Sequence, residues 1–452
     1  MAAGVARNTT LECMTSPAPA APRWRVMLRA VAARRITAWV AFALVHLWLG
    51  YLSFHSPASP FGDVLNVYRG WAEQAVYRDY WVGIDAIWVY PIVALVPIMA
   101  AALFGFTHYG LAWLVLVTLL DAVAFGFLLG RGRPHLARAW WWLAFLMLLG
   151  PIALDRIDSV TVPIAIVAVV LFAAHPRVGA FLLVIGTWIK IWPAAVLLAI
   201  VVASRHRGAV IATAVGSSIA IVVLALAFGS GTNVLSFVTE QTGRGLQIEA
   251  PVSTPWMWLA YAGVAGAAVN VNVALITYEV SGPGVEIASA LTTTLMAAAV
   301  ALIVVLGVIA VRRGASSASL LPVLSLALVT ALIVFNKVGS PQFISWLAVP
   351  LLFGLAASAA GAVSSFRTPA TIGLLLAFAT QGIYPNNYDA LLMLNPIMLV
   401  LLTGRNLLLI ALLGWAIASL WSLARARVSD LHASATTLSS APLTTPATHT
   451  KD

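Results

Sequence analysis

FGDVLNVYRGWAEQAVYRDYWVGIDAIWVYP, residues 61–91, lies between two apolar runs, and its contrast with them decides the fold class. The flanking runs, residues 37–54 and 86–104, are each long enough to cross about 30 Å of hydrocarbon as a helix. The stretch contains four of the 15 acidic residues of the chain, which are Asp63, Glu73, Asp79 and Asp85. Because acidic residues are so scarce in this chain, we expect the four in this loop to have a function.

Apolar residues recur in this loop at roughly helical spacing, namely Val64, Leu65, Val67, Tyr68, Trp71, Ala72 and Ala75. The pattern predicts an amphipathic helix over residues 65–76 that lies flat on the bilayer surface. Asp63 would stand at or just before its N-terminus and face water near the lipid headgroups. An aspartate is also a common N-terminal helix cap, so a purely structural role is the alternative.

The composition places the rest of the chain in a membrane. Of the 452 residues, 62% are hydrophobic and 9% are charged, and the mean hydropathy is +0.97, which leaves too little polar surface for a water-soluble globule. Apolar runs recur from residue 37 to the low 420s, so we predict an all-α polytopic membrane protein. The net charge of +10 comes mostly from the ends of these runs and from the tails. That distribution indicates positive-inside topology and contact with membrane lipids, not nucleic-acid binding. Cys13 is the single cysteine, so no intrachain disulfide is expected.

Three regions follow from this pattern. Residues 1–36 are predicted to form a cytoplasmic tail with a basic interfacial helix, residues 37–427 one integral membrane domain, and residues 428–452 a disordered cytoplasmic tail. About twelve spans are expected, with both termini inside. Near the end of the domain, residues 390–403 are interrupted by Asn-Pro and are expected to be interfacial or re-entrant, and residues 407–423 make the last crossing.

One part of this topology conflicts with the charge rule. Simple counting leaves RGRPHLAR, residues 131–138, on the outer side. The count treats residues 178–203 as one unbroken span, because that version needs no extra half-span. A break at KIWP, residues 190–193, would instead reverse everything between residues 105 and 175.

Two polar features of the first half of the chain face outward on this map. In the first, Asp63 is followed by Arg69, and by Tyr90 at the head of the next apolar run. In the second, Lys190 stands alone in an apolar run, two residues before Trp192. A buried ammonium group in a membrane is energetically costly, which indicates a functional or paired residue; a lysine snorkelling to the interface is the alternative.

Two further outward features lie in later loops. QTGRGLQIEAP, residues 241–251, and NKVGSPQF, residues 336–343, interrupt the apolar pattern and hold the candidates Arg244, Gln247, Glu249, Lys337, Ser340 and Gln342. A polar surface loop and a span cap are their alternative interpretations. Arg156, which lies between Asp155 and Asp158, predicts a local ion pair. Asp121 lies alone in an apolar run and requires a partner that the sequence does not identify.

Taken together and in order, these features resemble actinobacterial membrane glycosyltransferases of family 87. The similarity covers about residues 62–406 and consists of the acidic first outer loop, Tyr90-Pro91, KIWP, RGLQIEAP and NKVGSPQF. The resemblance implies the GT-C fold, a polyprenyl-phosphate sugar donor and Asp63 as the catalytic base. It implies polyprenyl-phosphate mannose as donor and a glycolipid or lipoglycan as acceptor; some relatives use decaprenyl-phosphate arabinose. The family often has two prolines after the tyrosine, where this chain has Tyr90-Pro91-Ile92, so the donor sugar and the acceptor stay open.

The residues support the same chemistry without the family. Transfer from a lipid phosphate requires a base to take the proton of the acceptor hydroxyl and cations to stabilise the departing phosphate. Asp63 is the candidate base, and the candidate phosphate ligands are Arg69, Lys190, Arg244 and Lys337. The predicted substrate site is completed by Tyr90, Trp192, Gln247, Glu249, Ser340 and Gln342.

Several classes of function remain in competition with this one. The chain has no glycine-rich fingerprint for a nucleotide sugar, which favours a lipid-linked donor. No cofactor is expected. A divalent metal is the alternative, for which a single aspartate without a close acidic partner makes a poor site. A lipid or solute transporter or flippase is the main alternative, although no repeat between the halves of the chain indicates one. A non-catalytic scaffold is the third.

Overall fold

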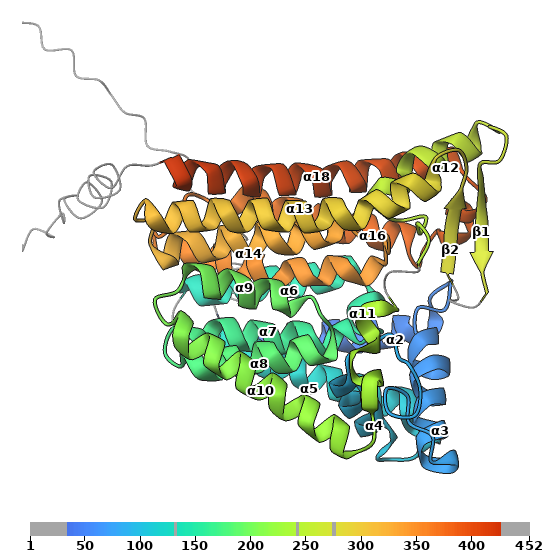
Figure 1. Ribbon diagram of the computed structural model, residues 1–452, viewed down its shortest axis with the longest axis horizontal. Coiled ribbons are helices and arrows are strands. Elements are labelled where there is room, and N and C mark those ends of the chain that lie inside the picture. The colour runs from blue at the N-terminus through green and yellow to red at the C-terminus, as the bar shows by residue number, and fades with distance from the viewer. Residues whose placement is uncertain (1–33, 131–132, 241–243, 274–276, 426–452) are drawn as a thin grey trace, which may run out of the picture.

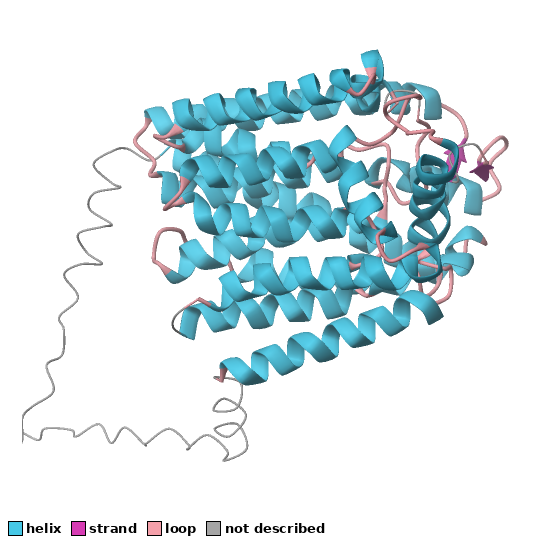
Figure 2. Ribbon diagram, turned by 90° about the horizontal axis from the view of Figure 1, so that it is seen from below, coloured by secondary structure: helices cyan, strands magenta, loops and turns pink. Residues whose placement is uncertain are grey.

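A computed structural model describes residues 34–130, 133–240, 244–273 and 277–425. Helices run side by side along one long axis, and short helices and a two-stranded sheet gather at one end (Figure 1; Figure 2). The predicted C-terminal tail and nearly all of the predicted N-terminal region lie outside the described residues.

The regular elements of the first half of the described chain are all helices. Its elements are α2 (Arg35–His55), the π-helix η1 (Asp63–Tyr68), α3 (Arg69–Arg78), the 3₁₀ turn η2 (Ile92–Ala94), α4 (Leu95–Ala102), η3 (Phe106–His108), α5 (Tyr109–Leu129), α6 (Arg133–Leu149), η4 (Pro151–Ala153), α7 (Asp158–Phe172), α8 (Pro176–Ile189), α9 (Pro193–Ala203) and α10 (Arg207–Ala227).

The second half contains the sheet and the longest helices. Its elements are η5 (Gly231–Leu235), α11 (Ser236–Thr239), η6 (Pro251–Ser253), α12 (Thr254–Tyr261), the antiparallel strands β1 (Ala268–Asn272) and β2 (Thr277–Ser281), α13 (Val285–Arg312), α14 (Ser317–Val334), η7 (Pro341–Leu347), α15 (Ala348–Ala359), α16 (Arg367–Ile383), α17 (Tyr388–Leu392) and α18 (Pro396–Arg425).

Seven helical segments of the described chain are long and apolar enough to cross a membrane. They are Arg35–His55, Phe106–Leu129, Arg207–Ala227, Val285–Arg312, Ser317–Val334, Pro341–Ala359 and Pro396–Arg425. Five shorter apolar helices accompany them. A helix satisfies its backbone hydrogen bonds internally, as hydrocarbon requires. Apart from the small sheet, the chain is an all-α polytopic membrane protein, as its composition predicts.

The helix predicted after Asp63 is present, as η1 followed by α3. Val64, Tyr68, Ala72 and Ala75 form its buried face, and Val76 and Tyr77 are exposed. The helical periodicity of the loop therefore identified its buried side correctly.

The chain between α2 and α5 stays at one end of the bundle. Arg35, at the start of α2, donates a hydrogen bond to the carbonyl of Gly130, just after α5. Gly110, at the start of α5, lies against Phe61 and Leu65 of the first loop. α5 therefore begins where α2 ends and ends where α2 begins. We call the end of the bundle that holds Asp63 the site end, and the end that holds Arg35 the arginine end.

The predicted crossing by residues 86–104 is consequently wrong. The helix within that run, α4, has only eight residues and is about 12 Å long. Tyr109, the first residue of α5, donates its hydroxyl proton to the carbonyl of Ile98 within α4 at 3.0 Å. Residues 133–138 of RGRPHLAR then begin α6 at the arginine end, so the conflict with the charge rule disappears.

The prediction of an unbroken span over residues 178–203 is also wrong. α8 ends at Ile189 and α9 begins at Pro193, whose missing N–H suits the first position of a helix. Trp192 donates to Thr161 near the start of α7 at 2.9 Å. At the other end of α9, the carbonyl of Ala203 accepts from Ser317 at 2.6 Å. α8 therefore reaches the site end, and α9 returns from it.

The division near the C-terminus is wrong as well, because α18 is one helix of 30 residues that runs through the predicted boundary. The side chain of Asn395 accepts a hydrogen bond from the N–H of Ile397 at 2.9 Å, which is the geometry of an N-terminal cap. Asn395-Pro396 therefore starts a helix and does not interrupt one.

Candidate functional site

Asp63 lies beside a buried arginine from a distant part of the chain. The Oδ2 of Asp63 is 3.1 Å from the Nε of Arg156, and the Asp63 side chain is 39% exposed. Asp63 begins the π-helix η1, whereas Arg156 belongs to the turn before α7. The arrangement leaves part of a carboxylate accessible while a cation fixes its orientation.

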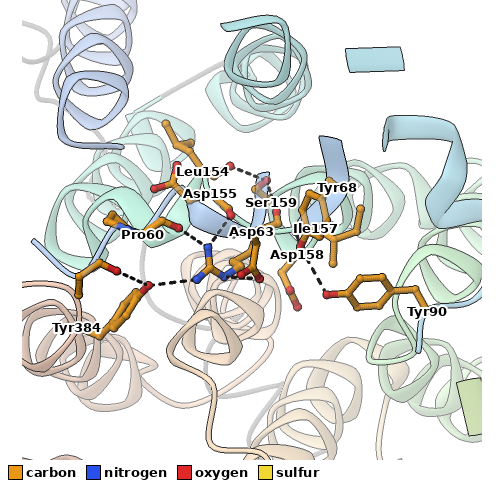
Figure 3. Close-up of polar contacts among 12 residues, drawn as sticks. Pro60, Asp63, Tyr68, Tyr90, Leu154, Asp155, Ile157, Asp158, Ser159 and Tyr384 are labelled. Atoms are coloured by element: carbon orange, nitrogen blue, oxygen red, sulfur yellow. Dashed lines mark hydrogen bonds and ion pairs between the residues drawn. The ribbon is translucent and has the colours of Figure 1, made fainter. Parts of the chain in front are cut away.

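The other nitrogens of Arg156 are also engaged. Nη1 donates to the carbonyls of Pro60 and Asp155, the latter at 2.9 Å, and Nη2 donates to the hydroxyl of Tyr384 at 3.2 Å. Figure 3 shows Pro60, Asp63 and Tyr384 gathered around this guanidinium group. Burial alone would lower the pKa of Arg156, but the facing Asp63 carboxylate outweighs that effect and the pKa lies above its usual value. Arg156 is therefore a permanently charged clamp.

Lys190 lies beside Asp158, the residue that follows this turn at the start of α7. Its Nζ is 3.9 Å from the Oδ2 of Asp158 and 4.5 Å from the centre of the Tyr90 ring. The Oδ1 of Asp158 accepts from the indole N–H of Trp346 at 2.6 Å. The Phe343 ring centre lies 5.9 Å from the same Nζ. The break between α8 and α9 thus places an ammonium group at the site end, against one carboxylate and two aromatic rings.

The hydroxyls of Tyr68 and Tyr90 lie between Asp63 and Lys190 and contact each other. The hydroxyl of Tyr68 accepts from the backbone N–H of Ile157 at 3.2 Å and lies 3.5 Å from the hydroxyl of Tyr90. Burial, followed by the neighbouring Tyr90 and Asp63, raises the pKa of Tyr68 well above its usual value. Tyr68 therefore stays a neutral hydrogen-bonding group.

Asp155 attaches the turn to α2. Its side chain is fully buried and accepts from the hydroxyl of Ser53 at 2.6 Å. Burial raises its pKa to about 8, although Ser53 and Arg156 both act in the opposite direction. Asp63, Asp155, Arg156, Asp158 and Lys190 thus form one polar cluster, which we call the 155–158 cluster.

The two later motifs lie against each other. The N–H of Gln247 donates to the carbonyl of Lys337 at 3.0 Å. Residues 246–248 also hydrogen-bond to β2. The N–H of Ile248 donates to the carbonyl of Tyr278, and the N–H of Val280 donates to the carbonyl of Leu246. Gly339 lies so close to this segment that a Cβ atom there would collide with the backbone of Glu249 and Ala250.

Glu249 is held by a buried ion pair with α18. Its Oε2 is 3.0 Å from the Nη1 of Arg405, and the two side chains are 5% and 1% exposed. Burial raises the pKa of Glu249 to about 7, against the effect of Arg405. Tyr388, whose pKa is raised by burial and then by Glu249, contacts Tyr384 with ring centres 5.0 Å apart. Through these two tyrosines the Glu249 region approaches Arg156.

The predicted site residues therefore separate into two groups, with Arg69 and Arg244 outside both. Asp63 and Lys190 belong to the 155–158 cluster, and Tyr90 contacts it through Lys190. Trp192 stacks at 5.6 Å on Trp346, which donates a hydrogen bond to Asp158. The packed later motifs contain Gln247, Glu249, Lys337 and Ser340. Gln342 is buried, and its backbone carbonyl accepts a hydrogen bond from the hydroxyl of Ser345. Arg69 instead pairs locally with Glu73 at 2.7 Å. Arg244 has a buried Nε with no hydrogen-bond partner among the described residues.

Sequence reasoning missed the partners that complete the cluster. Arg156 and Asp158 were visible as charges in an apolar region, but the structure pairs them with Asp63 and Lys190 and not with each other. Tyr384 carried no signal in the sequence. Asp121 does have a partner: its Oδ2 is 3.0 Å from the Nε2 of His46.

Within the described residues, no group of three or more His, Cys, Asp or Glu side chains is arranged to hold a metal ion. The site presents one accessible carboxylate, two nearby cations and several hydroxyls. No protein family model, no curated protein and no solved structure matches the chain, so this geometry carries the functional argument.

Proposed function

We propose that the chain is a membrane glycosyltransferase with a GT-C fold of about twelve spans. It would transfer a sugar, which is mannose on the sequence resemblance, from a polyprenyl-phosphate donor to a hydroxyl of a glycolipid or lipoglycan. The observation that carries the proposal is the 155–158 cluster: a part-exposed Asp63 and a largely buried Lys190 at one end of an apolar helix bundle.

The proposed reaction is an inverting displacement at the anomeric carbon. Asp63 takes the proton of the acceptor hydroxyl, whose oxygen forms the new bond to that carbon. The bond from the carbon to the phosphate oxygen breaks, and its electron pair leaves with the phosphate. Lys190 would stabilise the growing negative charge on that oxygen, where the low dielectric strengthens the attraction. Arg156 orients Asp63.

The membrane setting suits a lipid-linked donor. The site lies at the end of the bundle opposite Arg35, and basic residues at span ends favour the cytoplasmic side. We therefore assign the site to the extracytoplasmic face of a multi-pass cell-membrane protein. A phosphate at headgroup depth would reach Lys190 while its prenyl chain stays in the hydrocarbon.

Two other functions compete with this one. An arabinofuranosyltransferase using decaprenyl-phosphate arabinose would use the same base and cation, so only the donor distinguishes it. A transporter or flippase normally has its polar site near the midplane, between broken helices. The cluster at the site end favours an enzyme, although the break between α8 and α9 is a feature that transporters share.

The test is sugar transfer by the purified protein in lipid nanodiscs, with radiolabelled polyprenyl-phosphate mannose and, in parallel, decaprenyl-phosphate arabinose. A general base contributes about 10²- to 10⁴-fold, so Asp63→Asn should reduce the rate by at least roughly 100-fold. Asp79→Asn is the matched control, because Asp79 is exposed in the same loop and its left-handed φ of 50° suits asparagine.

Transfer at the wild-type rate by a folded Asp63→Asn protein would refute the assignment of the base. No transfer from either donor by the wild-type protein would leave the transporter as the better proposal.

A further inference from the structure

The loop just before Asp63 adopts an unfavourable backbone conformation. Ala58 and Ser59 have φ angles of 55° and 43°, in the left-handed region that residues with a Cβ atom rarely occupy. Such a conformation is energetically unfavourable for these residues and persists only where surrounding contacts hold it. The geometry of Asp63 therefore depends on what holds residues 58–62.

Two side chains from other parts of the chain hold this loop. Arg156 donates to the carbonyl of Pro60, and the hydroxyl of Tyr384 donates to the carbonyl of Ala58 at 3.4 Å. Tyr384 also accepts from Arg156 at 3.2 Å, so the two side chains act together. Arg156 contacts Asp63 itself with its remaining nitrogen, Nε.

We propose that Arg156 and Tyr384 are positioning residues for Asp63. Arg156 fixes the carboxylate directly and the preceding backbone through Pro60, while Tyr384 fixes the strained residue Ala58. The carbonyl of Asp155 fixes the guanidinium in turn, and Ser53 anchors the Asp155 carboxylate. The part of this inference that concerns catalysis rests on the proposed function; the part that concerns the placement of Asp63 does not.

The inference has a kinetic consequence. A displacement of about 1 Å in a reacting group can cost about 10²-fold in rate, so losing the clamp should reduce kcat. Lys190, not Arg156, faces the proposed phosphate, so the KM for the donor should change little. A cation that bound the donor would produce the opposite pattern.

Two variants separate the two contacts of the clamp. Arg156→Lys keeps the positive charge but loses the planar fork that reaches Asp63, Pro60 and Tyr384 at once. Tyr384→Phe removes one hydroxyl and keeps the aromatic ring next to Tyr388. We expect kcat to fall by about 10- to 100-fold in Arg156→Lys and about 10-fold in Tyr384→Phe, with donor KM within about threefold of wild type.

A second measurement does not depend on sugar transfer. Asp63 is labelled with a water-soluble carbodiimide and glycine ethyl ester, and the modified peptide is quantified by mass spectrometry, with Asp79 as the internal control. Arg156 occupies Oδ2 of Asp63, and Tyr384 holds both Arg156 and Ala58 in place. In both variants we therefore expect Asp63 to be labelled several times faster and Asp79 at an unchanged rate. Thermal unfolding in detergent identifies any variant that is not folded, and Tyr384→Phe then decides the test if Arg156→Lys fails.

The outcomes separate the two proposals. Faster labelling together with reduced kcat supports the inference. Faster labelling of Asp63 in the variants, together with a wild-type protein that transfers no sugar, supports the placement of Asp63 and refutes the proposed function. Unchanged labelling of Asp63 in a folded variant overturns the inference whatever the activity, and faster labelling with unchanged kcat overturns its catalytic part.

Discussion

At the scale of single residues, the turn before α7 shows how little sequence proximity says about pairing. Arg156 lies next to Asp155 and two positions from Asp158, which predicted a local ion pair. Its side chain instead pairs with Asp63. Asp155 accepts a hydrogen bond from the hydroxyl of Ser53, and Asp158 accepts one from the indole N–H of Trp346. Consecutive side chains of a turn point in different directions, so each buried charge finds the partner that tertiary packing brings to it.

Asp155 predicts a pH dependence of stability. Its pKa is about 8 in the folded chain against an ordinary value of 3.8, so the folded state binds an extra proton between these pH values. Stability should therefore fall as the pH rises from about 4 to about 8 and should not fall further above that range on account of this group. Asp155→Asn removes the titration, so its thermal unfolding temperature in detergent should depend less on pH, with the gain over wild type largest at pH 8.

The contribution of Glu249 can be distinguished from that of Asp155. The Glu249 pKa of about 7 against an ordinary 4.5 adds a second decrease that ends near pH 7. The Asp155→Asn variant should keep this second decrease of stability with pH, and the double variant that also carries Glu249→Gln should lose it. An unfolding temperature of Asp155→Asn with the full wild-type pH slope would show that Asp155 is not the titrating group.

At the scale of elements, the long helix α18 organises the loops at the site end. It carries Arg405 into a buried pair with Glu249, and its neighbour Asn406 donates to Thr254 at 2.9 Å. Trp258 of α12 donates to Thr403 of the same helix at 2.9 Å. The loop that contains RGLQIEAP is thus attached to a membrane-spanning helix and not merely laid on the surface.

The Glu249–Arg405 pair is suited to a double-mutant cycle. Removing one partner of a buried ion pair leaves an uncompensated charge and typically costs about 3–5 kcal/mol. Arg405→Met and Glu249→Gln should therefore each destabilise the protein strongly, while the double variant should lose clearly less than the two costs combined. Unfolding in detergent micelles at fixed pH measures all four proteins. Additive costs would show that the pair is not energetically coupled.

At the scale of the whole molecule, two ends of different chemistry define the orientation. Asp63, Lys190 and the sheet lie at the site end, with α3 and α12 (Figure 1). Arg35 lies at the opposite end, together with residues 133–138 and the connection after α9. The basic residues of that end agree with the positive-inside rule once α4 and the break at KIWP are taken into account.

Cysteine accessibility tests this orientation. On a Cys13→Ser background, single cysteines replace the exposed residues Arg78 and Tyr261 at the site end and Ala137 and Arg205 at the arginine end. We expect a membrane-impermeant maleimide added to intact cells to label the first two, and to label the last two only after lysis. Labelling of Ala137→Cys in intact cells would restore the topology in which residues 131–138 face outward.

The sequence alone determined that this is a helical membrane protein, that a helix follows Asp63, and which polar residues stand out in an apolar chain. Hydropathy and periodicity report these features directly, because they depend on the length and the buried face of a local segment. Tertiary structure alone decided that α4 does not cross, that KIWP turns the chain at the site end, and that Arg156 contacts both Asp63 and Tyr384, which lies 228 positions after Arg156. Apolar length does not say where a chain turns back, and a buried charge is satisfied by whichever partner packing supplies.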